Sequence, residues 1–131
     1  MIAYCTYCSK EKNDSKTLLP VLERYKSKRI STVFNFAKAK GLKFVILSGK
    51  YGILEVEQSI HYYDHLLSVN EVEKHSDMVV SQLKAKKITK IIFYTNSIEC
   101  DKNLKPYIDC ISMASAKGEI TLEIKELFFN D

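Results

Sequence analysis

The sequence predicts one α/β domain over residues 1–131, with three layers (α/β/α) around a mainly parallel sheet of four to five strands. Short β-prone segments alternate with segments in which apolar residues recur at helical spacing. One segment, residues 43–48 (KFVILS), is almost wholly apolar, which is typical of a strand covered on both faces. With 131 residues and 46% hydrophobic residues, the chain has enough apolar material for one core.

The first third of the chain predicts a strand and two helices. Residues 2–7 (IAYCTY) are β-prone and predict the first strand, and a polar loop follows. Pro20 suits the first turn of a short helix that runs to about Tyr25. A longer helix should begin near Lys28 and end at Gly41. Its apolar positions fall on one stripe: Ile30, Val33, Phe34 and Ala37.

The middle of the chain contains a long segment without a clean period, residues 53–67, which we expect to be an extended excursion. Long loops of that kind are often functional. Ser68 and Glu71 fit a capping box, which predicts a helix directly afterwards. One side of this helix should carry Val72, His75, Val79 and Leu83.

The last third predicts two strands around a helix. Residues 90–95 (KIIFYT) are expected to form the third strand. Asp101 or Asn103 is expected to cap a helix that runs to about Ala116 and is stopped by Gly118. Residues 120–128 alternate loosely and predict a fourth strand.

The charge pattern argues against a dedicated nucleic-acid binder. The formal net charge is only +4, and the basic residues gather modestly at positions 26–29 and 84–87. We expect both clusters to be solvated helix faces and ends, with binding of nucleic acid as the alternative. The chain has neither a long apolar run nor a recognisable signal peptide, so we expect a cytoplasmic protein that does not enter a membrane.

The four cysteines give a poor match to a zinc site. Cys5 and Cys8 form a C-x-x-C, but Cys100 and Cys110 are ten positions apart. Ordinary reduced cysteines are expected, with structural zinc and a redox pair as alternatives, so neither a metal nor another cofactor is predicted. Because Cys8 ends a strand close to Lys10, it is also a candidate nucleophile.

Polar loops follow the first two strands, and ligands of open α/β sheets bind beyond the carboxyl ends of strands. If these strands are neighbours, five side chains converge on one crevice: Ser9, Lys10, Lys12, Ser48 and Lys50. Lysines supply charge, serines supply hydroxyl donors, and Gly49 and Gly52 let backbone N–H groups approach closely, which together suits an anion. Neither loop matches a phosphate-binding fingerprint. The alternative is a plain glycine turn with a solvated lysine.

A second polar stretch lies at residues 60–65 (IHYYDH). His61 and His65 are four apart, but no third metal ligand is evident. Asp64 is the better candidate, either as an acid/base group or as an anchor for ligand hydroxyls, and the alternative is that it caps or bends the loop. Tyr51 and Tyr63 are expected to stack on a base or close the pocket.

Four motifs taken together resemble a family of small, uncharacterised bacterial and phage domains, which is loosely similar to a peroxide-stress protein family. The motifs are Cys-Ser-Lys-x-Lys, Tyr-x-Ser, Leu-Ser-Ala-Lys-Tyr-Gly-Leu-Leu and Tyr-Asp. Here they correspond to residues 8–12, Tyr25 to Ser27, residues 47–54 with Gly49 in place of alanine, and Tyr63-Asp64. The resemblance covers the first half of the chain, because the segment after Thr95 departs from the pattern. A fainter similarity exists to archaeal enzymes that modify 7-deazaguanine in transfer RNA.

We therefore expect an enzyme, or a degenerate enzyme, that binds a small anionic ligand resembling a nucleotide or nucleoside. The candidate catalytic residues are Asp64, Lys10 and Lys50. The candidate ligand-binding residues are Cys8, Ser9, Lys12, Tyr25, Ser27, Ser48, Gly49, Tyr51, Gly52 and Tyr63. The alternatives are a nucleic-acid-associated binding module without catalysis and a purely structural or partner-binding domain whose lysines are solvated.

Overall fold

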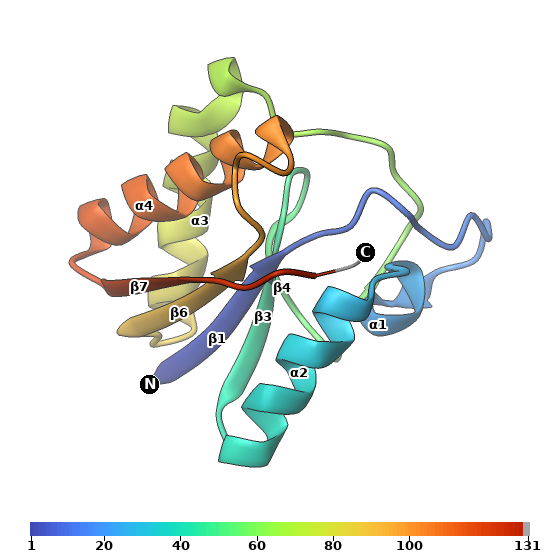
Figure 1. Ribbon diagram of the computed structural model, residues 1–131, viewed down its shortest axis with the longest axis horizontal. Coiled ribbons are helices and arrows are strands. Elements are labelled where there is room, and N and C mark those ends of the chain that lie inside the picture. Colours follow the sequence, from blue (N-terminus) through green and yellow to red (C-terminus); the bar gives the residue numbers. More distant parts are fainter. Residues whose placement is uncertain (130–131) are drawn as a thin grey trace.

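A computed structural model describes residues 1–129 and shows a mixed α/β fold built on a five-stranded, mostly parallel sheet (Figure 1). The strand order is β4-β3-β1-β6-β7, and only β4 runs antiparallel to its neighbour within this sheet. The strands are β1 (Ile2–Tyr7), β3 (Lys43–Ser48), β4 (Gly52–Glu55), β6 (Lys90–Thr95) and β7 (Thr121–Glu126). The helices are α1 (Val21–Arg24), α2 (Lys28–Lys40), α3 (Val72–Ala85) and α4 (Lys105–Gly118).

Strand β1 lies at the centre of the sheet and pairs in parallel with both β3 and β6. The chain leaves β1 for β3 on one side and then returns past β1 to reach β6 on the other side. The direction of strand order therefore reverses between β1 and β6. In open α/β sheets a ligand crevice forms at such a switch point, beyond the carboxyl ends of the strands.

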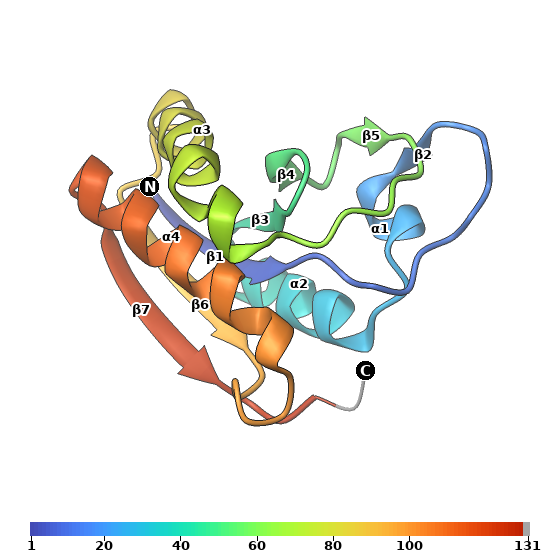
Figure 2. The same cartoon turned by 90° about the horizontal axis from the view of Figure 1, so that it is seen from above.

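The helices pack against the sheet. Figure 2 shows α3 and α4 side by side on one side of the sheet, and α2 on the other side, next to β1 and β3. Ser27 caps α2 by accepting a hydrogen bond from the Ile30 N–H at 3.1 Å. Gly41 ends α2 in the left-handed region, at φ 66°, as the sequence predicts. The capping box at Ser68 is also confirmed, and it leads through a 3₁₀ turn (Val69–Glu71) into α3.

Two segments differ from the sequence prediction. Within residues 53–67, the chain forms β4, which pairs with β3, and β5 (Ser59–Ile60), which pairs with β2 (Leu19–Pro20). These strands are too short to give a period: β4 is defined by its pairing with the preceding strand, and β5 by its pairing with a segment about 40 residues earlier. At the end of α4, Gly118 is the last helical residue, and Glu119 takes the left-handed conformation at φ 54°.

Arg24 in α1 is fully buried and organises the loop that precedes it. Its guanidinium donates hydrogen bonds to four backbone carbonyl oxygens: Asn13 at 2.5 Å, Ser15 at 3.0 Å, Thr17 at 2.6 Å and Ile60 at 3.1 Å. A guanidinium presents five donors in a fixed plane, which suits such a set of carbonyls. The loop over residues 13–17 is thereby tied to β5.

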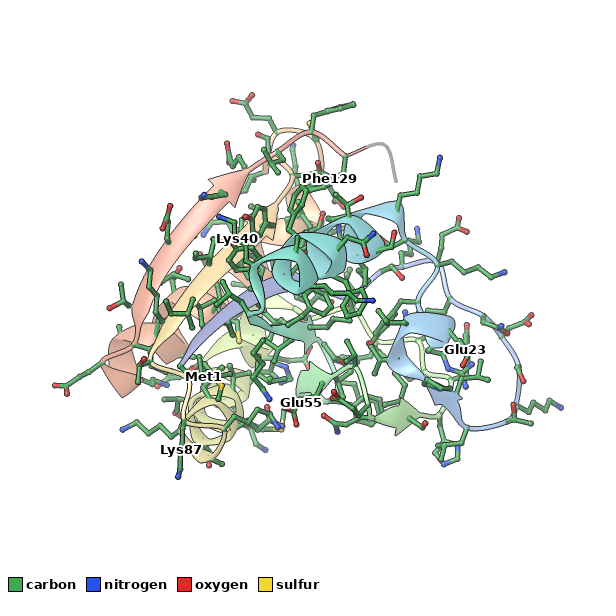
Figure 3. The ribbon with its side chains drawn as sticks, turned by 90° about the horizontal axis from the view of Figure 1, so that it is seen from below. Met1, Glu23, Lys40, Glu55, Lys87 and Phe129 are labelled. Atoms are coloured by element: carbon green, nitrogen blue, oxygen red, sulfur yellow. The ribbon has the colours of Figure 1, made fainter. Side chains whose placement is uncertain are left out.

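The two basic clusters do not form one exposed surface. Arg29 is 1% exposed, which corrects the expectation that residues 26–29 are a solvated face, and its guanidinium lies 3.5 Å from the Tyr7 ring. It donates to the Thr6 Oγ1 at 2.7 Å and the Tyr7 carbonyl at 2.6 Å. Figure 3 shows Lys87, at the end of α3, far from the start of α2. Within residues 1–129, no helix is long and apolar enough to cross a membrane.

Candidate functional site

A small cavity lies at the switch point of the sheet, between the loop after β1 and the start of α4. This inner cavity has a volume of about 90 Å³, which is room for several waters or one small anion. From the β1 side it is lined by Tyr7, Cys8, Ser9, Lys10 and Lys12. From the other side it is lined by Asp64, His65, Leu66, Asp101, Asn103, Leu104 and Tyr107.

A wider, more open hollow adjoins the inner cavity. This outer hollow has a volume of about 470 Å³ and is lined by Gly49, Lys50, Tyr63, Asp64, His65, Glu71 and His75. Asp64 and His65 line both spaces, so the segment that carries them separates the two. A volume of that size is in the ordinary range for a small-molecule site.

Buried hydroxyl groups form a chain beneath the outer hollow. Ser48 Oγ accepts hydrogen bonds from the N–H groups of Lys50 at 3.1 Å and Tyr51 at 3.0 Å. A serine oxygen has two lone pairs, so its own hydrogen is left to donate to Tyr63 Oη at 2.9 Å. Tyr63 in turn donates to Tyr25 Oη at 2.5 Å. Ser48 therefore fixes both the glycine turn and the direction of the chain.

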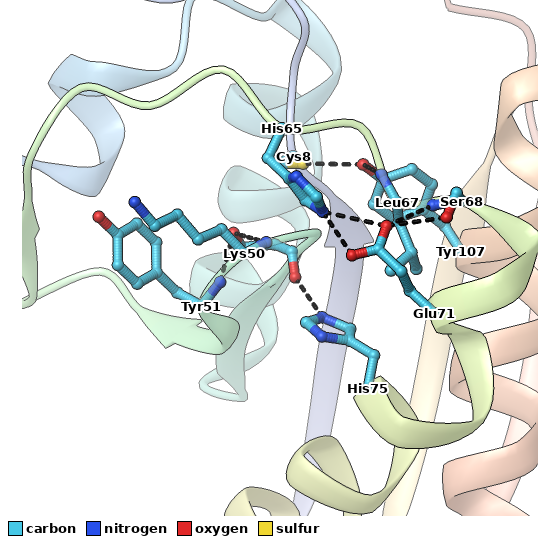
Figure 4. A network of polar contacts seen from close by, with 10 residues as sticks. Cys8, Lys50, Tyr51, His65, Leu67, Ser68, Glu71, His75 and Tyr107 are labelled. Atoms are coloured by element: carbon cyan, nitrogen blue, oxygen red, sulfur yellow. Dashed lines mark hydrogen bonds and ion pairs between the residues drawn. The ribbon is translucent and has the colours of Figure 1, made fainter.

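Tyr107 from α4 joins the same region. Its hydroxyl oxygen accepts a hydrogen bond from the Leu67 N–H at 3.1 Å and lies 3.8 Å from Cys8 Sγ (Figure 4). Burial, and next the nearby Cys8 thiol, raise the pKa of Tyr25, Tyr63 and Tyr107 above the ordinary value of 10. All three phenols therefore remain protonated donors at neutral pH.

A histidine and a glutamate form a hydrogen-bonded unit at the boundary of the two spaces. His65 Nε2 lies 2.9 and 3.1 Å from the two carboxylate oxygens of Glu71 (Figure 4). The Ser68 N–H and hydroxyl also donate to this carboxylate, at 3.0 and 2.9 Å, and they are the main reason that the pKa of Glu71 is lowered. His75 Nε2 lies 2.8 Å from the Ser48 carbonyl oxygen.

Gly49 lets these parts come together. A Cβ atom at this position would lie 2.8 Å from Tyr107 Oη, 3.1 Å from Leu67 N and 3.2 Å from the His65 carbonyl oxygen. A side chain would therefore push the 65–67 segment and α4 away from the turn. Gly52 has a different role, because its backbone takes φ 72° directly beneath the Gln82 side chain. The Gln82 amide accepts a hydrogen bond from the Ile53 N–H and donates one to the Tyr51 carbonyl oxygen.

The structure places the candidate residues from the sequence in three groups. Cys8, Ser9, Lys10, Lys12 and Asp64 line the inner cavity, and Gly49, Lys50, Tyr63 and Asp64 line the outer hollow. Ser48, Tyr25, Ser27, Tyr51 and Gly52 line neither space and act within the structure through the turn, the hydroxyl chain and the α2 cap. Lys12 Nζ lies 4.6 Å from the centre of the Tyr63 ring, and Lys50 Nζ lies 5.9 Å from it.

Sequence reasoning missed His65, Glu71 and Tyr107 as parts of the site. Glu71 was recognised only as a cap, and His65 was considered only as a metal ligand. Tyr107 belongs to the second half of the chain, where no motif pointed to a function. Within the described residues, no group of three or more His, Cys, Asp or Glu side chains could hold a metal ion.

Comparison with known proteins identifies a family but no characterised relative. No curated protein matches the chain. No solved structure matches it either. Residues 4–125 match a family of unknown function (DUF6884), in agreement with the resemblance to an uncharacterised family of small domains. Because the match covers nearly all of the sequence, this chain belongs to that family of unknown function.

Proposed function

We propose that this protein binds a small anionic ligand, resembling a nucleotide or nucleoside, at the carboxyl ends of the parallel strands. The observation that carries the proposal is the pair of adjoining spaces at the β1/β6 switch point, lined by lysines on one side and carboxylates on the other. The proposal takes the domain to be a three-layer α/β/α sandwich in the cytoplasm.

The charges suit a ligand with two kinds of groups. Lys10 and Lys12 enter the inner cavity from the loop after β1, while Asp64 and Asp101 face it from the opposite wall. Carboxylates on the wall would repel a ligand that carried only anionic groups. A ligand that carries both an anionic group and hydroxyl or amino donors fits both walls, and a nucleotide has a phosphate and a ribose.

In this proposal each wall has its own task. The lysines hold the anionic group by charge-assisted hydrogen bonds in the inner cavity, while the Ser9 hydroxyl donates to the Glu11 carbonyl oxygen and shapes the loop. Asp64, at the boundary, accepts a hydrogen bond from a ligand hydroxyl or transfers a proton. The larger part of the ligand occupies the outer hollow beside Lys50 and Tyr63.

Thermal unfolding with a ligand panel tests the proposal. The panel contains inorganic phosphate, ribose 5-phosphate, nucleosides and nucleoside 5′-monophosphates. A ligand at about 100 times its Kd stabilises the folded state by about 2.7 kcal/mol. For a chain of this size such stabilisation should raise Tm by roughly 10 °C. At least one phosphorylated compound should give a rise of this order.

Matched variants show whether the rise comes from this site. Lys10→Ala should remove most of it, and Asp64→Asn should reduce it for compounds with a ribose. Lys84→Ala changes an exposed lysine in the last turn of α3 and should leave the rise intact. The proposal fails if no compound shifts Tm, or if all three variants respond like the wild type. Salt-sensitive binding of DNA or RNA without any response to nucleotides would instead favour a nucleic-acid module.

A further inference from the structure

We propose that Cys8 is a nucleophile, activated by His65 and Glu71, that adds to an electrophilic carbon of the bound ligand. The inference rests on the proposed function, because the ligand must supply that carbon. It is carried by three features that meet at one place. A thiol lies at the switch point, an oriented imidazole lines the same cavity, and the buried Tyr107 hydroxyl lies 3.8 Å from the thiol sulfur.

The position of the thiol is the first feature. Cys8 follows the last residue of β1, and its N–H donates to the Leu47 carbonyl at 2.9 Å, so the backbone there is fixed by the sheet. The side chain is 7% exposed and lines the inner cavity next to Ser9 and Lys10. The other candidate thiols differ, because Cys5 and Cys110 are fully buried and line neither space, and Cys100 is exposed on the surface.

The orientation of the imidazole is the second feature. A carboxylate can only accept hydrogen bonds, so His65 Nε2, which lies against Glu71, carries the ring hydrogen. The neutral ring then has its lone pair on Nδ1, which is the atom that can take a proton. His65 and Cys8 both line the inner cavity. An oriented base beside a thiol is the usual arrangement for activating a sulfur nucleophile.

The hydroxyl donors are the third feature. The Tyr107 oxygen accepts hydrogen bonds from the Leu67 N–H and, at 3.8 Å, from the Cys8 thiol. Once the sulfur loses its proton, the Tyr107 hydrogen is available to stabilise the negative charge. The chain from Ser48 through Tyr63 ends at Tyr25, which is 4% exposed, so these hydroxyl groups are withheld from water.

The proposed step is an addition that conserves atoms and electrons. The proton of the Cys8 thiol passes to His65 Nδ1. The sulfur electron pair forms a C–S bond to a ligand carbon that is doubly bonded to oxygen or nitrogen. The π pair of that double bond moves to the oxygen or nitrogen, which receives the proton from His65. No oxidant, reductant or second substrate is required.

Alkylation of the native protein tests the nucleophile without a known substrate. Iodoacetamide is neutral and iodoacetate is anionic; both form an S–C bond and release iodide. Mass spectrometry of peptides measures the rate at each cysteine, and fragment ions separate Cys8 from Cys5. Cys100 is the internal standard for an exposed thiol, and Cys5 and Cys110 report unfolding. Cys8 should react faster than Cys100, and its advantage should be greater with iodoacetate because lysines line the cavity.

Variants identify the base. His65→Asn should slow alkylation of Cys8 at least about tenfold, since general base catalysis typically contributes more than that. His61→Asn changes an exposed histidine outside both spaces and should leave the rate unchanged. Glutamine at position 71 can still complete the capping box but carries no charge. Glu71→Gln should therefore slow the alkylation of Cys8 with little loss of folding stability. Resistance of Cys8 to both reagents, or an unchanged rate in His65→Asn, overturns the proposal.

The two proposals can fail separately. If nucleotides raise Tm in both the wild type and Cys8→Ser while Cys8 alkylates no faster than Cys100, the protein binds the ligand without this chemistry. If Cys8 alkylates rapidly in a His65-dependent manner but no compound of the panel shifts Tm, the nucleophile stands and the proposed ligand class is wrong.

Discussion

Replacing Ser48, in the turn after β3, with alanine should lower the free energy of unfolding by more than the replacement of an exposed serine does. The hydroxyl is fully buried and makes three hydrogen bonds, two from the backbone N–H groups of Lys50 and Tyr51 and one to Tyr63. A buried hydrogen bond of this kind contributes about 1 kcal/mol net. Alanine leaves no large cavity, so the loss should be about 3 kcal/mol. For this chain length Tm should fall by roughly 10 °C.

Urea unfolding followed by circular dichroism measures the change. The free energy of unfolding should fall with little change in its denaturant slope, because the surface exposed on unfolding is nearly the same. Ser81→Ala provides the control, since Ser81 is an exposed residue within α3. A loss below about 1 kcal/mol in Ser48→Ala would refute the reasoning, because it would mean that water or another group replaces the hydroxyl at little cost.

Further predictions concern the same turn, the buried phenols and one ion pair. Gly49→Ala should lose about 1–3 kcal/mol through overpacking, and Tyr107→Phe should recover part of this loss, so additive losses in a double-mutant cycle would contradict the contact. Burial raises the pKa of the site tyrosines, so the folded protein retains protons that the unfolded chain releases above pH 10. Stability should therefore fall as the pH rises above about 10, and absorbance at alkaline pH should show that these tyrosines ionise late, together with unfolding. Complete ionisation of all tyrosines near pH 10 while the protein is still folded would contradict this prediction. The ion pair with Lys43 lowers the pKa of Glu55 below 4.5, so the wild type should be more stable than Glu55→Gln at pH 7 by under about 1 kcal/mol. That advantage should disappear as the pH falls below about 4.5, and a difference that persisted at pH 2 would argue against the ion pair.

The long strands of the sheet and the long helices follow from local pattern, and the structure confirms them. The segments at β1, β3 and β6 are apolar and β-prone, and α2 and α3 carry both periodic stripes and recognisable caps. The short strand β4 could not be predicted, since it exists only because Gly52 reverses the chain onto β3 while Gln82 from a distant helix holds the turn.

The candidate site was only partly accessible to sequence reasoning. The loops after β1 and β3 could be found because parallel strands bring their carboxyl ends to one edge. However, Ser48 looks like a ligand donor in the sequence, and only the structure shows that two backbone N–H groups already occupy it. His65 and Tyr107 meet beside Gly49 through tertiary packing, which no spacing along the chain encodes.

Arg24 has a consequence for how this family can diversify. It holds the 13–17 loop by peptide carbonyls, which every amino acid possesses, and not by side chains. Substitutions at those positions therefore leave the anchor intact, while the loop continues into Lys12 and the inner cavity. A single buried guanidinium would thus let the side chains of residues 13–17, beside the inner cavity, change without loss of the anchor that holds their backbone.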